Sequence, residues 1–168
     1  MNQNFQVSTN NEVLAVNFTT FSDNSETCKI VVNRHCKYVV VALNVVDATR
    51  DLVRIALVKD ALDRQLDKDT EVILNLGYMP QARADRQFEE GQPHPLKVFA
   101  KMLNALEFDA VLLKDTHSDV TEALIDNVEI TQQGSVLRQY MPRILKDLPD
   151  FTLCAPDLGA AKKMFDTA

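Results

Sequence analysis

The sequence predicts an α/β fold in which helices flank a mostly parallel sheet. Short apolar runs rich in β-branched residues alternate along the chain with segments of helical periodicity, which is the pattern of βαβ units. The 168 residues are 46% hydrophobic and 25% charged, values typical of globular proteins, and they suffice for one domain and the start of a second.

The first part of the chain is expected to hold an antiparallel ribbon, a strand and a long helix. Residues 12–18 and 28–32 predict the two ribbon strands, and residues 38–44 predict the next strand. Residues 48–66 carry an apolar stripe at helical spacing, so this helix should lie against the sheet. Asp47 precedes it and is a suitable N-cap.

The alternation continues to the end of the chain. Strands are expected at residues 71–76, 110–113, 128–131 and 151–155, and helices at residues 95–106, 118–125 and 135–148. Residues 156–163 have the pattern of a turn and a helix start, which begins a new lobe rather than closing one. We therefore expect residues 1–150 to form an N-terminal lobe and residues 151–168 to begin a truncated second lobe, as in a fragment of a two-lobed protein.

The charge and hydropathy of the sequence limit the kinds of partner that we expect this protein to bind. The net charge is −6, so we expect no general attraction to nucleic acid or to an anionic membrane. The longest apolar run, residues 38–43, is too short to cross a bilayer, and residues 1–4 show no signal-peptide pattern. Three cysteines without metal-ligand spacing indicate free thiols in a reducing cytoplasm.

The loop at residues 77–86, Gly-Tyr-Met-Pro-Gln-Ala-Arg-Ala-Asp-Arg, is the first site candidate. It follows a predicted strand, and open α/β sheets bind ligands at the carboxyl ends of their strands. Arg83 and Arg86 flank Asp85, and guanidinium groups suit phosphate oxygens and flat rings, so we expect a phosphate-bearing nucleotide ligand. The alternative is a solvated loop with internal ion pairs. Residues 87–94 are polar and resemble a flap over the site.

Two further segments are candidates. In residues 115–119, Asp-Thr-His-Ser-Asp, His117 could orient phosphates, donate a proton or neighbour a metal, whereas spacing alone favours a helix cap at Ser118 or Asp119. Residues 21–26 form a polar turn in which Phe21 either packs inward or stacks on adenine. The four glycines make neither a P-loop nor a dinucleotide-binding turn, so any nucleotide must be held by side chains.

Taken in this order, the segments resemble the ribose-phosphate pyrophosphokinase (phosphoribosyl pyrophosphate synthetase) family from about residue 18 onward. Residues 21–23 resemble its Phe-Ser-Asp-Gly-Glu turn, residues 78–86 its Tyr-Ala-Arg-Gln-Asp-Arg segment, and residues 95–103 its Pro-Ile-Ser-Ala-Lys-Leu helix. Residues 115–117 are similar to its Asp-Leu-His, and residues 156–162 to its Pro-Asp-x-Gly-Gly-x-Lys. The Arg-Ala-Asp-Arg and His-Ser-Asp-Val details are similar to divergent members of bacteriophage type.

The resemblance implies a phosphoribosyltransferase-like (Rossmann-like) lobe. It also implies transfer of a pyrophosphoryl group from Mg-ATP to the anomeric hydroxyl of ribose 5-phosphate, giving phosphoribosyl pyrophosphate and AMP. Such transfer needs positioning and charge neutralisation more than covalent chemistry. The family forms symmetric oligomers in which a neighbouring chain completes the adenine pocket, so a homo-oligomer is expected.

The resemblance also implies residue roles. Phe21 and Arg83 would sandwich adenine, with Asp23 near the base edge, while Asp85 and Arg86 would lie beside the ATP phosphates. The catalytic pair would be His117, which ligates magnesium or contacts the phosphates, and Asp157, which holds the ribose hydroxyls and neighbours the metal.

Departures from the family pattern leave alternatives open. Ala84 replaces a glutamine, and the Phe-Ser-Asp turn is one residue longer, which leaves open whether Glu26 replaces the family glutamate. The family's catalytic flexible loop and phosphoribosyl-binding loop would fall beyond residue 168, so the isolated chain should be inactive and lack the 5-phosphate pocket. Two alternatives remain open. The acceptor is ADP-ribose, in NAD salvage, or the chain is a non-catalytic regulatory subunit of the same family.

Overall fold

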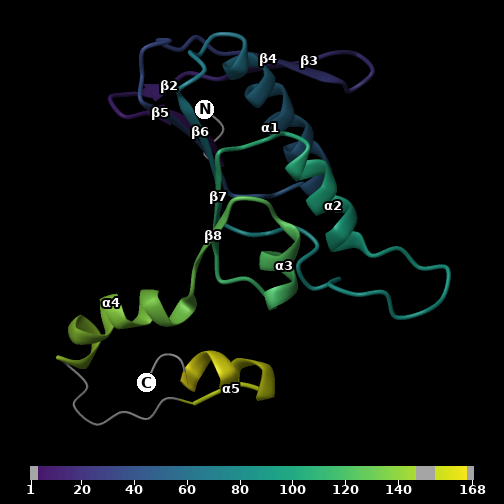
Figure 1. Ribbon diagram of the computed structural model, residues 1–168, viewed down its shortest axis with the longest axis vertical. Coiled ribbons are helices and arrows are strands. Elements are labelled where there is room, and N and C mark those ends of the chain that lie inside the picture. The colour runs from purple at the N-terminus through teal and green to yellow at the C-terminus, as the bar shows by residue number, and fades with distance from the viewer. Residues whose placement is uncertain (1–3, 147–153, 166–168) are drawn as a thin grey trace.

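The computed structural model describes residues 4–146 and 154–165 (Figure 1). Its main sheet has six strands in the order β2-β1-β5-β6-β7-β8, and β3 and β4 form a separate two-stranded sheet. The strands are β1 (Phe5–Thr9), β2 (Val13–Leu14), β3 (Asn17–Thr20), β4 (Glu26–Lys29), β5 (Tyr38–Leu43), β6 (Glu71–Leu76), β7 (Ala110–Lys114) and β8 (Val128–Thr131). The helices are α1 (Ala48–Asp63), α2 (Pro95–Asn104), α3 (Asp119–Leu124), α4 (Gln133–Leu145) and α5 (Leu158–Phe165).

The sheet is mostly parallel, as predicted. Strands β5, β6, β7 and β8 pair in chain order and in parallel, whereas β1 joins β5, and β2 joins β1, in antiparallel fashion. Helices α1, α2 and α3 lie on one side of this sheet (Figure 1). Because each helix joins two parallel neighbours, the carboxyl ends of β5, β6 and β7 and the loops that follow them meet at one edge.

The core lies between the sheet and these helices. Alternate residues of the central strands are fully buried, and they pack with the apolar faces of α1 and α2 in one cluster. Burial of each such side chain contributes roughly 1.5–3 kcal/mol. The opposite face of the sheet carries half-buried or exposed residues, which include Val40, Ala42, Ile73 and Leu112.

The N-terminal strands differ from the prediction. The strand expected at residues 12–18 is wrong as a single element, because β2 pairs with β1 in the main sheet while β3 leaves to pair with β4. Strand β1 was not predicted from its short, partly polar sequence. The antiparallel ribbon itself is confirmed, with Phe18 opposite Cys28.

The helices agree with the prediction in position, with ends that differ by a few residues. Asp47 caps α1 as expected, since its Oδ1 accepts hydrogen bonds of 3.1 Å from the backbone N–H groups of Thr49 and Arg50. None of the helices among the described residues has the length and apolarity needed to cross a membrane. The strand expected at residues 151–155 and the lobe boundary at residue 150 fall largely outside the described residues and stay predictions.

Candidate functional site

The loop between β6 and α2 and the loop between β7 and α3 meet at the carboxyl edge of the sheet. The first loop is anchored by Met79 and Ala82, which are buried, and by a hydrogen bond of 3.3 Å from the Leu96 amide to the Ala84 carbonyl. Each loop also holds one non-glycine residue in the left-handed region, Gln81 at φ 61° and Asp115 at φ 43°. Such strained residues concentrate at functional sites because the surrounding structure must hold them in place.

Asp85 joins the two loops. Its carboxylate is buried and accepts hydrogen bonds from Arg86 Nε at 2.9 Å and from Ser118 Oγ at 2.7 Å. The Arg86 guanidinium and then the Ser118 hydroxyl lower the pKa of Asp85 to about 2, and a charge on nearby His117 acts in the same direction. Asp85 is therefore an anion at neutral pH. It fixes the position of the loop at residues 77–86, the arginine loop, relative to His117.

The hydrogen bond between Ser118 and Asp85 explains why Ser118 does not cap α3 with its side chain, as the spacing had predicted. Ser118 occupies the N-cap position of α3, but its side chain makes no capping hydrogen bond because the hydroxyl donates to Asp85. The loop is also not merely a solvated segment with internal ion pairs, because the buried carboxylate ties it to a second loop. The site residue missed by sequence reasoning is thus Ser118 as the partner of Asp85.

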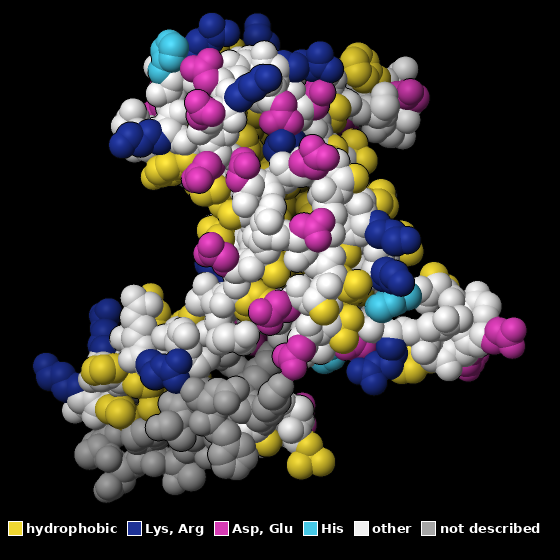
Figure 2. Space-filling model, viewed as in Figure 1, with side chains coloured by type: hydrophobic (Ala, Val, Ile, Leu, Met, Phe, Trp, Pro, Cys, Tyr) yellow, Lys and Arg dark blue, Asp and Glu magenta, His cyan; other side chains and the backbone are white. Residues whose placement is uncertain are grey.

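Arg83 lines a cavity of about 320 Å³ between the arginine loop and the start of α1. Tyr78, Pro80 and Gln81 line the same cavity from the loop, and Val45, Val46 and Ala48 line it from the other side. Arg83 is exposed and, among the described residues, has no ion-pair partner. Its guanidinium and the half-exposed Tyr78 ring are thus available to a flat or anionic ligand. Figure 2 shows acidic and basic side chains interspersed over the visible face, so attraction to an anion is local.

Phe21 lies at the tip of the β3–β4 hairpin and does not pack inward. It is 53% exposed, so of the two alternatives the inward-packed one is wrong. Asp23 shapes the turn, since it accepts hydrogen bonds from the Ser25 hydroxyl at 2.6 Å and the Ser25 amide at 3.0 Å, and the hydroxyl bond lowers the pKa of Asp23. The hairpin and the arginine loop lie apart in Figure 1, and Phe21 and Arg83 make no cation–π contact within the described residues.

Glu26 holds the hairpin on α1 rather than facing a ligand. Its buried carboxylate pairs with Arg50 at 2.9 Å and with Arg54 at 2.7 Å, and the Arg54 guanidinium lies 4.7 Å from the Phe18 ring centroid. The Arg54 hydrogen bond is the main cause that lowers the pKa of Glu26 to about 2. Glu26 therefore positions the turn that carries Phe21 and Asp23.

His117 and Asp157, the two proposed catalytic residues, lie on different segments and, within the described part of the chain, make no direct bond to each other. His117 is exposed at the carboxyl edge, whereas Asp157 caps α5 by accepting a hydrogen bond of 2.8 Å from the Ala160 amide. Within residues 4–146 and 154–165, no hydrogen bond or ion pair joins the two, and no cluster of three or more His, Cys, Asp or Glu residues could hold a metal. A magnesium ion would fit here only if phosphate oxygens supplied most of its ligands, which is its usual manner of binding with nucleotides.

Comparison with known proteins supports the fold. No protein-family model matches the sequence. Among solved structures, the chain is similar to phosphoribosylpyrophosphate synthetase from Mycobacterium smegmatis, with a TM-score of 0.66 and 21% sequence identity. The match covers 81% of this chain and 46% of that protein, so this chain spans about half of its length. At this identity the likeness confirms the predicted phosphoribosyltransferase-like α/β fold, and residue roles must rest on the geometry of this chain.

Proposed function

We propose that this chain is the ATP-binding lobe of a ribose-phosphate pyrophosphokinase-like transferase. In the proposed reaction, the anomeric hydroxyl of ribose 5-phosphate attacks the β-phosphorus of Mg-ATP, the bond to the α-phosphate oxygen breaks, and AMP leaves. One observation carries the proposal: the hydrogen bond between Ser118 and Asp85 fixes two loops at the carboxyl edge of the sheet with Arg83 and His117 both exposed there. The fold likeness supports it independently.

The arginine loop would bind the nucleotide. Arg83 and Tyr78 line one cavity and can contact the adenine ring by stacking and cation–π attraction. Arg86 keeps a side chain that is 66% exposed although one edge is paired with Asp85, so its remaining N–H groups can donate to phosphate oxygens. His117 would contact the same phosphates from the neighbouring loop.

Phe21 and Asp23 would act from a second copy of the chain. They lie on a hairpin that is held on α1 and does not reach the arginine loop of its own chain. An exposed aromatic at a hairpin tip is suited to cover a ligand on a neighbouring molecule, which agrees with a homo-oligomer whose adenine pocket contains residues of two chains.

Magnesium would enter with ATP and neutralise charge on the transferred group. His117 and Asp157 are the proposed protein neighbours of the ion, and Asp157, at the start of α5, is the residue proposed to hold the ribose hydroxyls. The chain's own contribution is orientation: Asp85 and Ser118 hold the loops, Arg83 holds the base, and Arg86 holds the phosphates.

Calorimetric titration with Mg-ATP tests this assignment. We expect Arg83→Ala and His117→Ala each to weaken binding by about tenfold or more, because each removes a charge-assisted or stacking contact. Arg64→Ala is the matched control, since Arg64 is an exposed arginine paired with Asp60 at the other end of α1, and it should bind as the wild type does. Unchanged binding in both site variants would overturn the assignment.

An assay for AMP release then addresses the acceptor. Ribose 5-phosphate and ADP-ribose are each offered with Mg-ATP, and the acceptor that gives AMP identifies the reaction. Because the isolated chain should be inactive, the assay is made on a protein that also carries the expected second lobe; there, binding of Mg-ATP without AMP release from either acceptor would support a regulatory subunit.

A further inference from the structure

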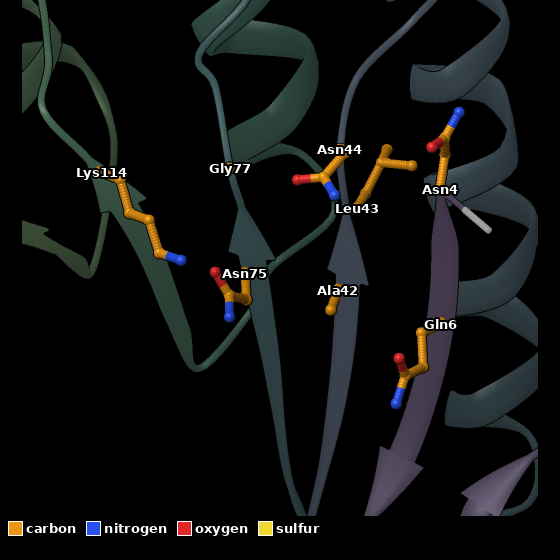
Figure 3. Close-up of a pocket in the computed structure, with 8 residues that line it drawn as sticks. All are labelled: Asn4, Gln6, Ala42, Leu43, Asn44, Asn75, Gly77 and Lys114. Atoms are coloured by element: carbon orange, nitrogen blue, oxygen red, sulfur yellow. The ribbon is translucent and has the colours of Figure 1, made fainter.

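A second pocket opens on the other face of the sheet, away from α1, α2 and α3. It has a volume of about 200 Å³, and Figure 3 shows the residues that line it, which are Asn4, Gln6, Asn44, Asn75 and Lys114 with polar side chains, together with Ala42, Leu43 and Gly77. It shares no lining residue with the cavity beside Arg83. The notable feature is that its polar groups are four amides and one ammonium, with no carboxylate.

The register of the sheet places these residues in two rows. Gln6 pairs with Ala42, Ala42 with Asn75, and Asn75 with Leu112, which makes one row across four strands. The adjacent row begins where the Asn44 amide donates to the Asn4 carbonyl at 2.9 Å and continues through Gly77 to Lys114. Since side chains alternate along a strand, all of them face the side opposite the core.

Polarity on this face is concentrated at the carboxyl edge. One step further from that edge the same strands carry Val40 and Ile73, which are ordinary strand residues. Asparagine is disfavoured within strands, so Asn75 at the penultimate position of β6 does not serve strand formation. The side chains of Gln6, Asn44 and Asn75 make no hydrogen bond within the described residues, which leaves their donors and acceptors available.

Gly77 keeps the pocket open. A Cβ atom at this position would clash with Asn44 Oδ1, so any side chain would displace the Asn44 amide from the space that it occupies. Lys114 closes the other end of the row, with its amine directed toward Asn75 (Figure 3). Lys114 is exposed and has no ion-pair partner among the described residues.

We propose that this pocket binds a small phosphorylated sugar, with the phosphate on the Lys114 ammonium and the hydroxyls on the amides of Asn44 and Asn75. An ammonium pairs with phosphate as a point charge, and amides offer both a donor and an acceptor to a hydroxyl group. The absence of acidic lining residues fits an anion in a chain whose net charge is −6. The site lies back to back with the Arg83 cavity, because residues 44 and 77 face one pocket and residues 45 and 78 the other.

Calorimetric titration without nucleotide tests the site, with ribose 5-phosphate, inorganic phosphate and ribose as probes. We expect ribose 5-phosphate to bind at least tenfold more tightly than inorganic phosphate, and ribose alone to give no measurable binding. Lys114→Gln should weaken ribose 5-phosphate binding by about tenfold or more. Asn75→Asp keeps the size of the side chain, places a negative charge in the pocket and should abolish binding. Lys97→Gln, at an exposed lysine of α2, is the matched control and should bind as the wild type does.

The proposal is overturned if Lys114→Gln and Asn75→Asp bind ribose 5-phosphate as the wild type does, or if the wild type binds inorganic phosphate as tightly as ribose 5-phosphate. Lys114→Gln changes an exposed side chain and keeps the test usable where Asn75→Asp does not fold. The proposal rests on the proposed function only for the choice of sugar, and the pocket is a further site, separate from the acceptor site at which Asp157 would hold the ribose hydroxyls. Its failure is distinct, since Lys114→Gln should leave Mg-ATP affinity unchanged while Arg83→Ala should leave ribose 5-phosphate affinity unchanged.

Discussion

Asp85→Asn removes the charge that joins the two site loops while it keeps the shape of the side chain. The carboxylate is 5% exposed and receives hydrogen bonds from Arg86 and Ser118. Its pKa falls from 3.8 to about 2 in the folded state, so the charged form stabilises the fold. By linkage, a shift of this size corresponds to roughly 2 kcal/mol at most, since each unit is about 1.4 kcal/mol.

The sign of the pH dependence follows from the lowered pKa. The stabilisation is present in full above the unfolded pKa near 4, and it is lost as pH falls through about 2. In urea unfolding at pH 7, we expect Asp85→Asn to be less stable than the wild type by about 1–2 kcal/mol. The difference should shrink between pH 4 and pH 2, because protonation removes the same charge from the wild type.

The control for this comparison is Asp60→Asn, which breaks an exposed ion pair with Arg64 and should leave stability unchanged. Glu26 also titrates in this window, but it is present in both proteins and cancels in the difference. Equal stability of Asp85→Asn and wild type at pH 7, or a difference that stays constant from pH 7 to pH 2, would refute the reasoning.

Glu26, Asp47 and Phe21 each offer a substitution with a measurable outcome. Glu26→Gln leaves Arg54 beside a neutral group and should lower the free energy of unfolding by about 2 kcal/mol or more in urea, most strongly above pH 4.5; no loss at pH 7 would contradict the structural role of the buried pair. Asp47→Ala removes the two cap hydrogen bonds of α1 and should cost about 1 kcal/mol in thermal unfolding, and an unchanged melting temperature would argue against the cap. Phe21→Ala should leave the melting temperature unchanged, because the ring is exposed, yet weaken Mg-ATP binding at concentrations where the protein is oligomeric; weakening of equal size in the monomer would exclude the two-chain pocket.

The sheet and its helices could be predicted because their signals are local. Apolar alternation marks β5, β6 and β7, Pro95 marks the start of α2, and Asp47 marks the start of α1. No local signal decides which of the two sheets a strand joins. Residues 12–18 look continuous in sequence, and only the pairing of β2 with β1 and of β3 with β4 divides them.

The sequence analysis named the residues of the candidate site but not the contacts between them. Arg83, Arg86 and His117 could be found because charged residues follow predicted strands. Ser118 and Asp85, which form a hydrogen bond, are 33 residues apart in the sequence, and no local pattern in either segment predicts this pairing. The sequence left open whether Glu26 replaces the family glutamate, because the arginines that pair with it lie on a helix 24 and 28 residues away. The pocket lined by Asn44, Asn75 and Lys114 likewise depends on strand register, which sequence alone does not predict.

The central claim is that the carboxyl-edge loops hold ATP, and photoaffinity labelling with 8-azido-ATP tests it most directly. Labelled peptides are identified by mass spectrometry, with excess Mg-ATP as the competitor that must suppress the labelling. The account predicts that the label lies within residues 77–86, joined in the oligomer by residues 18–29 of the hairpin. Label that Mg-ATP suppresses but that falls in neither segment would contradict it.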